Sequence, residues 1–205
     1  MTSYNNTKWE IGVTITITKK GNRMCTDQVL HCYNHPLLAV ILNPLHVKIQ
    51  NPRLFEIEVD EIVNSDSLKF ASKSQTLIKE IDVPKISLEQ RFEFGIRVTK
   101  LVYKDKKWNL WADKWLSGED RSRGSADAAA DGAAYAYTYA RAADVAARAA
   151  YVAARAAYVA DVARAAARAA DVAHAAAYAA RSVNTKEEFN EKMIDVIEKI
   201  VKVEA

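Results

Sequence analysis

The chain has 205 residues, a mass of 22.8 kDa, a formal net charge of +3 and a hydrophobic fraction of 50%. This length accommodates one or two domains. Residues 1–125 hold 19 Lys and Arg against 15 Asp and Glu, and residues 126–205 hold 10 against 11. No clustered basic stripe stands out, so a nucleic-acid partner is not expected. The polar N-terminus lacks the apolar core of a signal peptide, and no stretch is free enough of charge to span a membrane. We therefore expect a soluble, cytoplasmic protein.

Alternating apolar residues predict the first elements. Residues 9–18 follow the period of a half-buried strand. Five apolar side chains share one face of this segment: Trp9, Ile11, Val13, Ile15 and Ile17. Residues 55–60 and 76–83 predict two further strands, and residues 35–44 predict a short buried helix bounded by two prolines.

Two longer helices are predicted next. Ser87 and Gln90 fit a capping box, after which apolar residues continue at helical spacing to Tyr103. A second helical segment ends at Gly118. One side of it carries three tryptophans: Trp108, Trp111 and Trp115.

Residues 126–181 include 31 alanines among 56 residues. Alanine is the best helix former, and from Arg141 the Arg, Asp or Tyr, and Val residues recur every seven positions. This pattern predicts a long, coiled-coil-like helix. Whether the helix continues past Gly132 and Asp161 is left open.

An alanine-rich helix buries little apolar area, and aliphatic surface that could cover it is scarce elsewhere in the chain. We therefore expect this module to form a homo-oligomer through close helix packing. The expected interface contains the valines of the module: Val145, Val152, Val159, Val162 and Val172.

The predicted organisation is α+β, with a small antiparallel sheet and short helices in residues 1–118. Residues 119–125 form a charged linker, and residues 126–181 form the alanine-rich module. Residues 182–205 contain an amphipathic helix that opens with a capping box at Thr185. We expect this helix to pack as a lid on the first domain or on a neighbouring alanine helix.

Reactive side chains are densest in the first third of the chain. The set comprises Cys25, His31, Cys32, His35 and His46. The first four of these could supply the tetrahedral ligands of a zinc ion. The spacing matches no familiar zinc motif, and we expect neither a metal nor a cofactor. A Cys32 nucleophile with a nearby histidine, or acid–base chemistry by Glu56 and Glu58, are weaker alternatives.

The tryptophans suggest stacking platforms for a nucleotide-like anion, because two arginines that could bind phosphate follow them. Tryptophans at this spacing also pack in ordinary cores, and both interpretations remain open. The candidate ligand-binding residues are Trp108, Trp111, Trp115, Arg121, Arg123, His31, His35 and Arg53.

Several strings within residues 24–181 carry a resemblance to a known family. They include LHCYNHPLLAV at 30–40, NPLH at 43–46, NPRLFE at 51–56 and WLSGEDRS at 115–122, and the shorter Thr26-Asp27, Lys79-Glu80-Ile81 and Trp111-Ala112-Asp113. The chain resembles an uncharacterised family of tailed bacteriophages and bacteria, whose members carry alanine-rich tails with Ala-Ala-Tyr and Ala-Ala-Asp units. The family has no established activity. The resemblance implies a phage or prophage setting, in which small accessory proteins often act against host defence.

The sequence therefore predicts a non-enzymatic, phage-type homo-oligomer in the cytoplasm of a bacterial host. We expect it to counteract host defence by sequestering a nucleotide-like anion or a host protein. One alternative is a small enzyme centred on His31, His35 and Glu56. Another is a purely structural scaffold built from the alanine helices.

Overall fold

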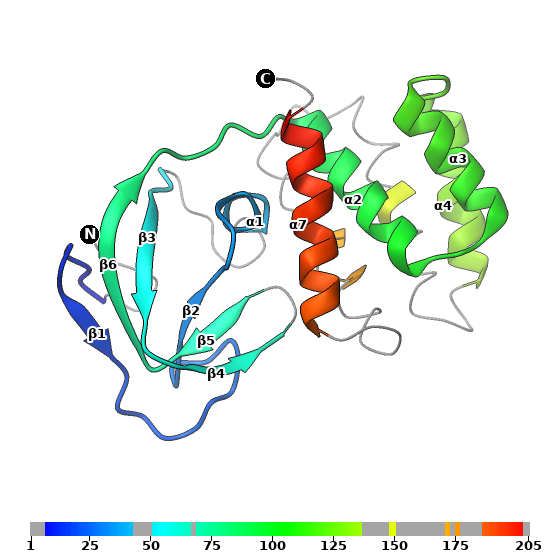
Figure 1. Cartoon of the computed structure of the whole chain (residues 1–205). Coiled ribbons are helices and arrows are strands. Elements are labelled where there is room, and N and C mark those ends of the chain that lie inside the picture. The colour runs from blue at the N-terminus through cyan, green and yellow to red at the C-terminus, as the bar shows by residue number, and fades with distance from the viewer. Residues whose placement is uncertain are drawn as a thin grey trace.

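The computed structural model describes residues 7–42, 51–66, 69–136, 148–150, 171–172, 175–176 and 186–202. These residues form an α+β fold, with two small antiparallel sheets on one side and helices on the other (Figure 1). The strands are β1 (Thr14–Thr16), β2 (Leu30–Cys32), β3 (Leu54–Val59), β4 (Ile62–Ser65), β5 (Phe70–Ser72) and β6 (Ser74–Ile81). The helices are α1 (Pro36–Leu42), α2 (Leu88–Val102), α3 (Lys106–Ser117), α4 (Arg123–Ala136) and α7 (Lys186–Lys202).

The first sheet has the strand order β1-β6-β3, with β6 antiparallel to both neighbours. Strands β3 and β6 confirm the two strands expected after residue 50, with ends shifted by one or two residues. A bulge between Glu56 and Ile57 shifts the register of the β3–β6 pair. The inward face includes Leu77 and Gln75, both buried.

The long first strand expected over residues 9–18 is largely wrong. Only Thr14–Thr16 is a strand, because the chain turns at Gly12, which has a φ of +79°. The Gly12 amide donates to the Leu77 carbonyl at 2.8 Å, and the Val13 amide donates to the Glu10 carbonyl at 3.2 Å. Ile11 and Val13 are consequently 57% and 44% exposed rather than part of a buried face.

The second sheet has the strand order β2-β5-β4 and was not predicted. Its strands are three or four residues long, too short to display the alternation by which strands are recognised. His31 pairs with Ala71 and Cys32 with Phe70 in the β2–β5 ladder. The sheet thereby brings residues near 30 beside residues near 70.

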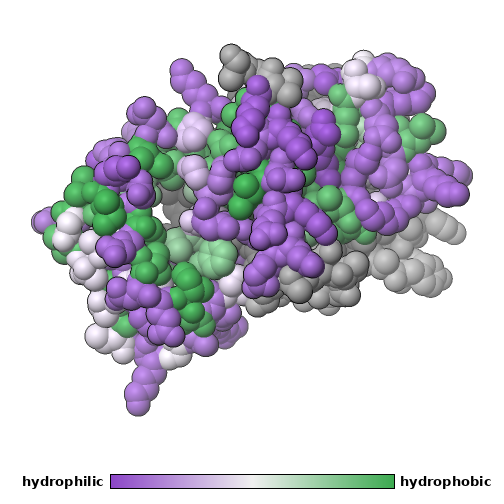
Figure 2. All heavy atoms as spheres, viewed as in Figure 1, coloured by the Kyte–Doolittle hydropathy of each residue, from purple (hydrophilic) through white to green (hydrophobic). Residues whose placement is uncertain are grey.

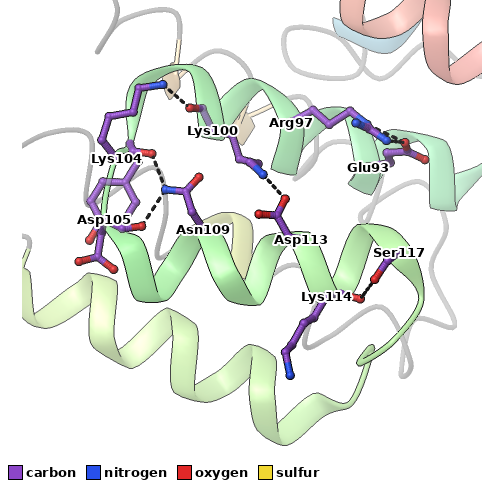
Figure 3. Close-up of polar contacts among 10 residues, drawn as sticks. Glu93, Arg97, Lys100, Lys104, Asp105, Asn109, Asp113, Lys114 and Ser117 are labelled. Carbon is purple, nitrogen blue, oxygen red and sulfur yellow. Dashed lines mark hydrogen bonds and ion pairs between the residues drawn. The ribbon is translucent and has the colours of Figure 1, made fainter.

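Helices α1, α2 and α3 confirm the sequence predictions. At the start of α2, Ser87 and Gln90 form the expected capping box, and α3 ends at Gly118 in the left-handed conformation. The Asp105 side chain accepts from the Trp108 amide at 2.8 Å and caps α3. Asn109 bonds the carbonyls of Tyr103 and Asp105, holding the turn between α2 and α3 (Figure 3).

The hydrophobic core lies among the helices. Helix α7 packs against α1 and α2, as expected for a helix that covers the first domain. The largest fully buried side chains include Leu38 and Ile41 from α1, Phe94 from α2, and Phe189 and Met193 from α7. None of the described helices is long and apolar enough to cross a membrane.

The described part of the alanine-rich segment joins this same core. Helix α4 begins at Arg123, inside the expected linker, and continues through Gly132 without a break. Ala126, Ala130 and Ala133 are buried where α4 lies along α3 (Figure 1). The domain boundary at 119–125 stays a prediction, although residues on both sides of it share one cluster.

The described residues of the alanine-rich segment do not confirm one straight helix. The Arg148 guanidinium lies 3.2 Å from the Asp171 carboxylate. In a straight helix these residues would be about 35 Å apart. Ala149, Ala150, Val172 and Ala176, which lie close to these two residues in the sequence, belong to the core cluster.

The expected oligomer interface is only partly visible. Val172 is 1% exposed within a single chain, so its own chain already covers it. Val145, Val152, Val159 and Val162 lie outside the described residues. The scarcity of aliphatic partner surface suggested self-association. The buried residues described in this segment, however, share one hydrophobic cluster with residues of α1, α2, α3 and α7 of the same chain.

Candidate functional site

The candidate site begins with the loop between β1 and β2, which hydrogen bonds from one lysine hold in place. Lys73, between β5 and β6, donates from Nζ to the carbonyls of Lys19 at 2.8 Å and Gln28 at 2.6 Å. It also donates to the Gly21 carbonyl at 2.5 Å. One ammonium thus neutralises three carbonyl dipoles and fixes both ends of the loop. The loop carries Cys25.

Gly21 is required for this loop conformation. Its φ is +99°, where a side chain is rarely tolerated, and an added Cβ would lie 2.3 Å from Gln28 Oε1. The same Oε1 accepts from the Arg23 amide at 3.3 Å. Local contacts therefore determine the conformation of the loop in the residues that precede Cys25.

Cys25 is held at the backbone while its side chain is exposed. It has a φ of +59°, an uncommon value for a residue other than glycine. Its amide donates to His31 Nε2 at 3.0 Å, which ties the loop to strand β2. The Cys25 thiol is exposed to solvent. A residue held in this left-handed conformation at a surface is the kind of backbone feature found at functional sites.

Lys69 brings a buried ammonium to the thiol. The residue is 5% exposed, and its Nζ donates to Cys25 Sγ at 3.2 Å. Two hydrogen bonds to Asp66 set its position just before β5. There the Lys69 amide donates to Asp66 Oδ1 at 3.0 Å, and the Asp66 amide donates to the Lys69 carbonyl at 3.3 Å. Because the Lys69 side chain is buried rather than mobile at the surface, the fold keeps its ammonium directed at the sulfur.

The surrounding titratable groups respond to this arrangement. Burial lowers the pKa of His31, and the Lys69 charge lowers it further, while Asp66 opposes the shift. Burial raises the pKa of Tyr33, and electrostatic interactions with Asp66 and Cys25 add to the shift. Since Nε2 of His31 accepts from the Cys25 amide, the neutral ring carries its proton on Nδ1.

The other cysteine has a different environment. Cys32 is half-buried, its Sγ lies 3.8 Å from the Phe70 carbonyl oxygen, and burial raises the pKa of its thiol to about 11. A thiol in this environment stays protonated near neutral pH, and the thiolate is the nucleophilic form. The sequence suggested Cys32 as a nucleophile, whereas the structure favours Cys25 in that role.

The other residues of the suggested enzyme do not meet at one site. His35 Nε2 lies 3.4 Å from a carboxylate oxygen of Glu198, and Glu56 pairs with Lys79 at 3.0 Å. His31 instead contacts the Cys25 loop. No group of three or more His, Cys, Asp or Glu in the described part of the chain is placed to hold a metal ion. His46 lies outside that part.

The residues expected to bind an anion are paired or buried. All three tryptophans of α3 are buried in the helical core. The Arg121 guanidinium lies 4.7 Å from the centre of the Trp115 ring and also pairs with Glu89. Arg123 pairs with Asp127 at 3.3 Å. The interpretation of the tryptophans as core residues is the one their burial favours.

Arg53 is likewise paired. Its Nε donates to Glu80 Oε1 at 2.7 Å, and its guanidinium lies 5.0 Å from the centre of the Phe55 ring. The cation thus joins the ends of β3 and β6. The predicted ligand-binding residues come from separate parts of the fold, and anion binding by them stays a prediction.

Acidification is expected to destabilise the fold through His31. The unfolded histidine gains its proton near its ordinary pKa of about 6.5, whereas the folded residue gains it only at lower pH. The unfolded state therefore binds more protons as the pH falls below about 7, and stability decreases through the pKa of folded His31. Protonation of Nε2 would also replace the acceptor of the Cys25 amide by a second donor.

Urea unfolding of the wild-type protein and His31→Gln at several pH values between about 5 and about 7.5 measures this effect. Glutamine retains a side-chain acceptor but does not titrate. We expect the midpoint of His31→Gln to fall less steeply on acidification. Equal slopes for the two proteins would show that His31 does not contribute.

Comparisons with known proteins assign neither a family nor a function to the chain. No protein-family model matches the chain, and neither the curated proteins nor the solved structures give a match. The resemblance to the phage family thus remains an expectation from the sequence, and the functional argument depends on the geometry of the site.

Proposed function

We propose that the protein is a peroxide-reactive thiol protein in which Cys25 is the nucleophile. The observation that carries the proposal is the contact of 3.2 Å between the Lys69 ammonium and the exposed sulfur of Cys25. Reactive cysteines occur in partly exposed, electropositive surroundings, because a nearby cation favours the thiolate. Lys69 supplies that cation from a buried position, where water screens it little.

The reaction is a two-electron oxidation of the thiol. The Cys25 thiolate attacks one peroxide oxygen, so that an S–O bond forms and the O–O bond breaks. The departing oxygen takes up a proton and leaves as water, or as an alcohol when the substrate is an organic peroxide. The product is a sulfenic acid, the first and reversible step of cysteine oxidation.

Trapping of the sulfenic acid tests the proposal. Wild-type protein is treated with limiting hydrogen peroxide in the presence of a 1,3-diketone, and the labelled residue is identified by mass spectrometry. We expect the label on Cys25 and at least about tenfold less on Cys32, whose thiol is half-buried and protonated. Cys25→Ser removes the label, whereas Cys32→Ser leaves it unchanged. A label mainly on Cys32, or a Cys25 that is neither labelled nor otherwise oxidised by the peroxide, would contradict the proposal.

Binding, the function expected from the sequence, is a second proposal. Four apolar residues are exposed on or beside the strands: Ile11, Val13, Ile62 and Ile78. Hydrophobic residues show over the sheets in Figure 2, whereas hydrophilic residues cover α7. The arginines that were expected to bind an anion, Arg53, Arg121 and Arg123, each lie beside a carboxylate. These observations favour a protein partner, and the strand β1 at the sheet edge favours a second copy of this chain.

Light scattering of the purified protein measures this self-association. We expect a discrete oligomer that Ile78→Asp converts towards monomer, because a carboxylate on the apolar surface resists burial. Glu58→Asp, which changes an exposed polar residue on the neighbouring strand, is the matched control. A monomeric wild-type protein would contradict this proposal and leave the thiol proposal unaffected.

A further inference from the structure

We infer that oxidised Cys25 is captured by Lys69 as a sulfenamide, a covalent bond between Cys25 Sγ and Lys69 Nζ. This inference rests on the proposed function, because it requires the sulfenic acid of Cys25. It assigns to the pair a modification site that joins two segments 44 residues apart in the chain. The ligand class is a peroxide, and the second reactant is the protein's own amine.

Both atoms of the new bond are already held in contact. Lys69 Nζ lies 3.2 Å from Cys25 Sγ, and the backbone of each residue is fixed separately. On one side, Lys69 is fixed by its two hydrogen bonds to Asp66. On the other, Cys25 is fixed by His31, and its loop is held by Lys73. Such placement gives an intramolecular reaction a large advantage over attack by a molecule from solution.

The chemistry balances with one equivalent of hydrogen peroxide. In the first step, the thiol and the peroxide give a sulfenic acid and one water. In the second, the Lys69 ammonium releases a proton to solvent, and the amine lone pair attacks sulfur. The S–N bond forms as the S–O bond breaks, and the hydroxide that leaves takes up a proton to become a second water. The protein has then lost two hydrogens, one from the thiol and one from the amine.

The Lys69 amine is the nucleophile that the structure places against the Cys25 sulfur, at 3.2 Å. Cys32, the alternative partner, directs its sulfur to the Phe70 carbonyl, and its thiol is protonated at neutral pH. His31 is occupied at Nε2 by the Cys25 amide. Capture by Lys69 would also block further oxidation to the sulfinic acid, which is irreversible in most proteins. A thiol reductant would reopen the bond and restore both side chains.

The bond also has a structural consequence. It would link the loop between β1 and β2 covalently to the residues that precede β5, across sheet elements with little buried apolar area. A covalent link of this kind restricts the unfolded chain, as a disulfide does. We therefore expect the oxidised protein to melt at a higher temperature than the reduced protein, and the difference to vanish after reduction.

The experiment uses the full chain with Cys32→Ser, so that a disulfide cannot form. The protein is treated with one equivalent of hydrogen peroxide, alkylated, cleaved with a protease that does not cut at lysine, and analysed by mass spectrometry. We expect a joined peptide containing Cys25 and Lys69, lighter by two hydrogens than its separate parts and released by dithiothreitol. Lys69→Arg keeps a cation beside the sulfur but lacks the amine, and should give no joined peptide. Lys79→Arg, at an exposed site, should give as much as the parent protein.

The outcomes separate the two proposals. If a 1,3-diketone labels Cys25 but no joined peptide forms, the sulfenamide is overturned and the peroxide-reactive thiol stands. If Cys25 is neither labelled nor joined, both fail. A joined peptide that carries an additional oxygen, or one that forms equally in Lys69→Arg, overturns the S–N bond.

Discussion

Replacing Phe189 by alanine is expected to lower the free energy of unfolding by about 3–5 kcal/mol. Phe189 is fully buried where α7 packs against α1 and α2. Removing the ring loses the free energy gained by transferring it from water into the core. It also leaves a cavity that neighbouring side chains fill only in part. The effect is large because α7 covers the core formed by helices from the first half of the chain.

Urea unfolding followed by circular dichroism measures this loss. Glu191→Ala, two residues from Phe189 and on the exposed face of α7, is the matched control, and we expect it to change stability by no more than about 0.5 kcal/mol. A Phe189→Ala protein as stable as the control would mean that α7 does not pack on this core.

Trp115→Ala should have a comparable effect, again about 3–5 kcal/mol. The Trp115 side chain is 4% exposed in the helical core, and its ring also supports the Arg121 guanidinium. The prediction distinguishes the two interpretations of the tryptophan series. Truncating a core residue lowers the free energy of unfolding. Truncating an exposed residue on which a ligand stacks lowers ligand affinity and changes stability little.

Leu110→Ala is the control within the same helix, because Leu110 is 61% exposed. Its melting temperature should stay close to that of the wild-type protein, while Trp115→Ala melts far lower. If both variants retained wild-type stability, the tryptophan face would not be core, and a ligand site on α3 would again become the stronger interpretation.

The helices could be predicted from the sequence because their signals are local. The capping box at Ser87, the three tryptophans at helical spacing and the terminal Gly118 act within one or two turns. The structure shows the capping box and the terminal Gly118 in their expected roles, and it places the tryptophans on one buried side of α3. The same holds for the short helix α1 between its prolines.

The second sheet and the thiol site could not be predicted in this way. Strands β2, β4 and β5 are too short to show a period, so nothing in the sequence placed Lys69 beside Cys25. That contact depends on strand pairing across some 40 residues of chain. The sequence indicates Cys25 only as a potential metal ligand, and no pattern in it points to Lys69.

The partner of the alanine-rich segment could not be predicted for a related reason. Its repeat predicts that small residues face a closely packed partner, but it does not say which partner. The Arg148–Asp171 contact and the burial of Val172 show that the partner of these residues is the same chain. Self-association through the remaining valines, which lie outside the described residues, stays a prediction.

The most direct test of the thiol site is the rate at which iodoacetamide alkylates each cysteine of the folded wild-type protein, with the same measurement in urea as the reference. We predict that Cys25 reacts at least about tenfold faster than Cys32 in the folded protein, and that unfolding largely removes the difference. A folded protein in which Cys32 reacts as fast as Cys25 would contradict the account, because it would show that Lys69 and the loop around Cys25 do not set the reactivity of that thiol.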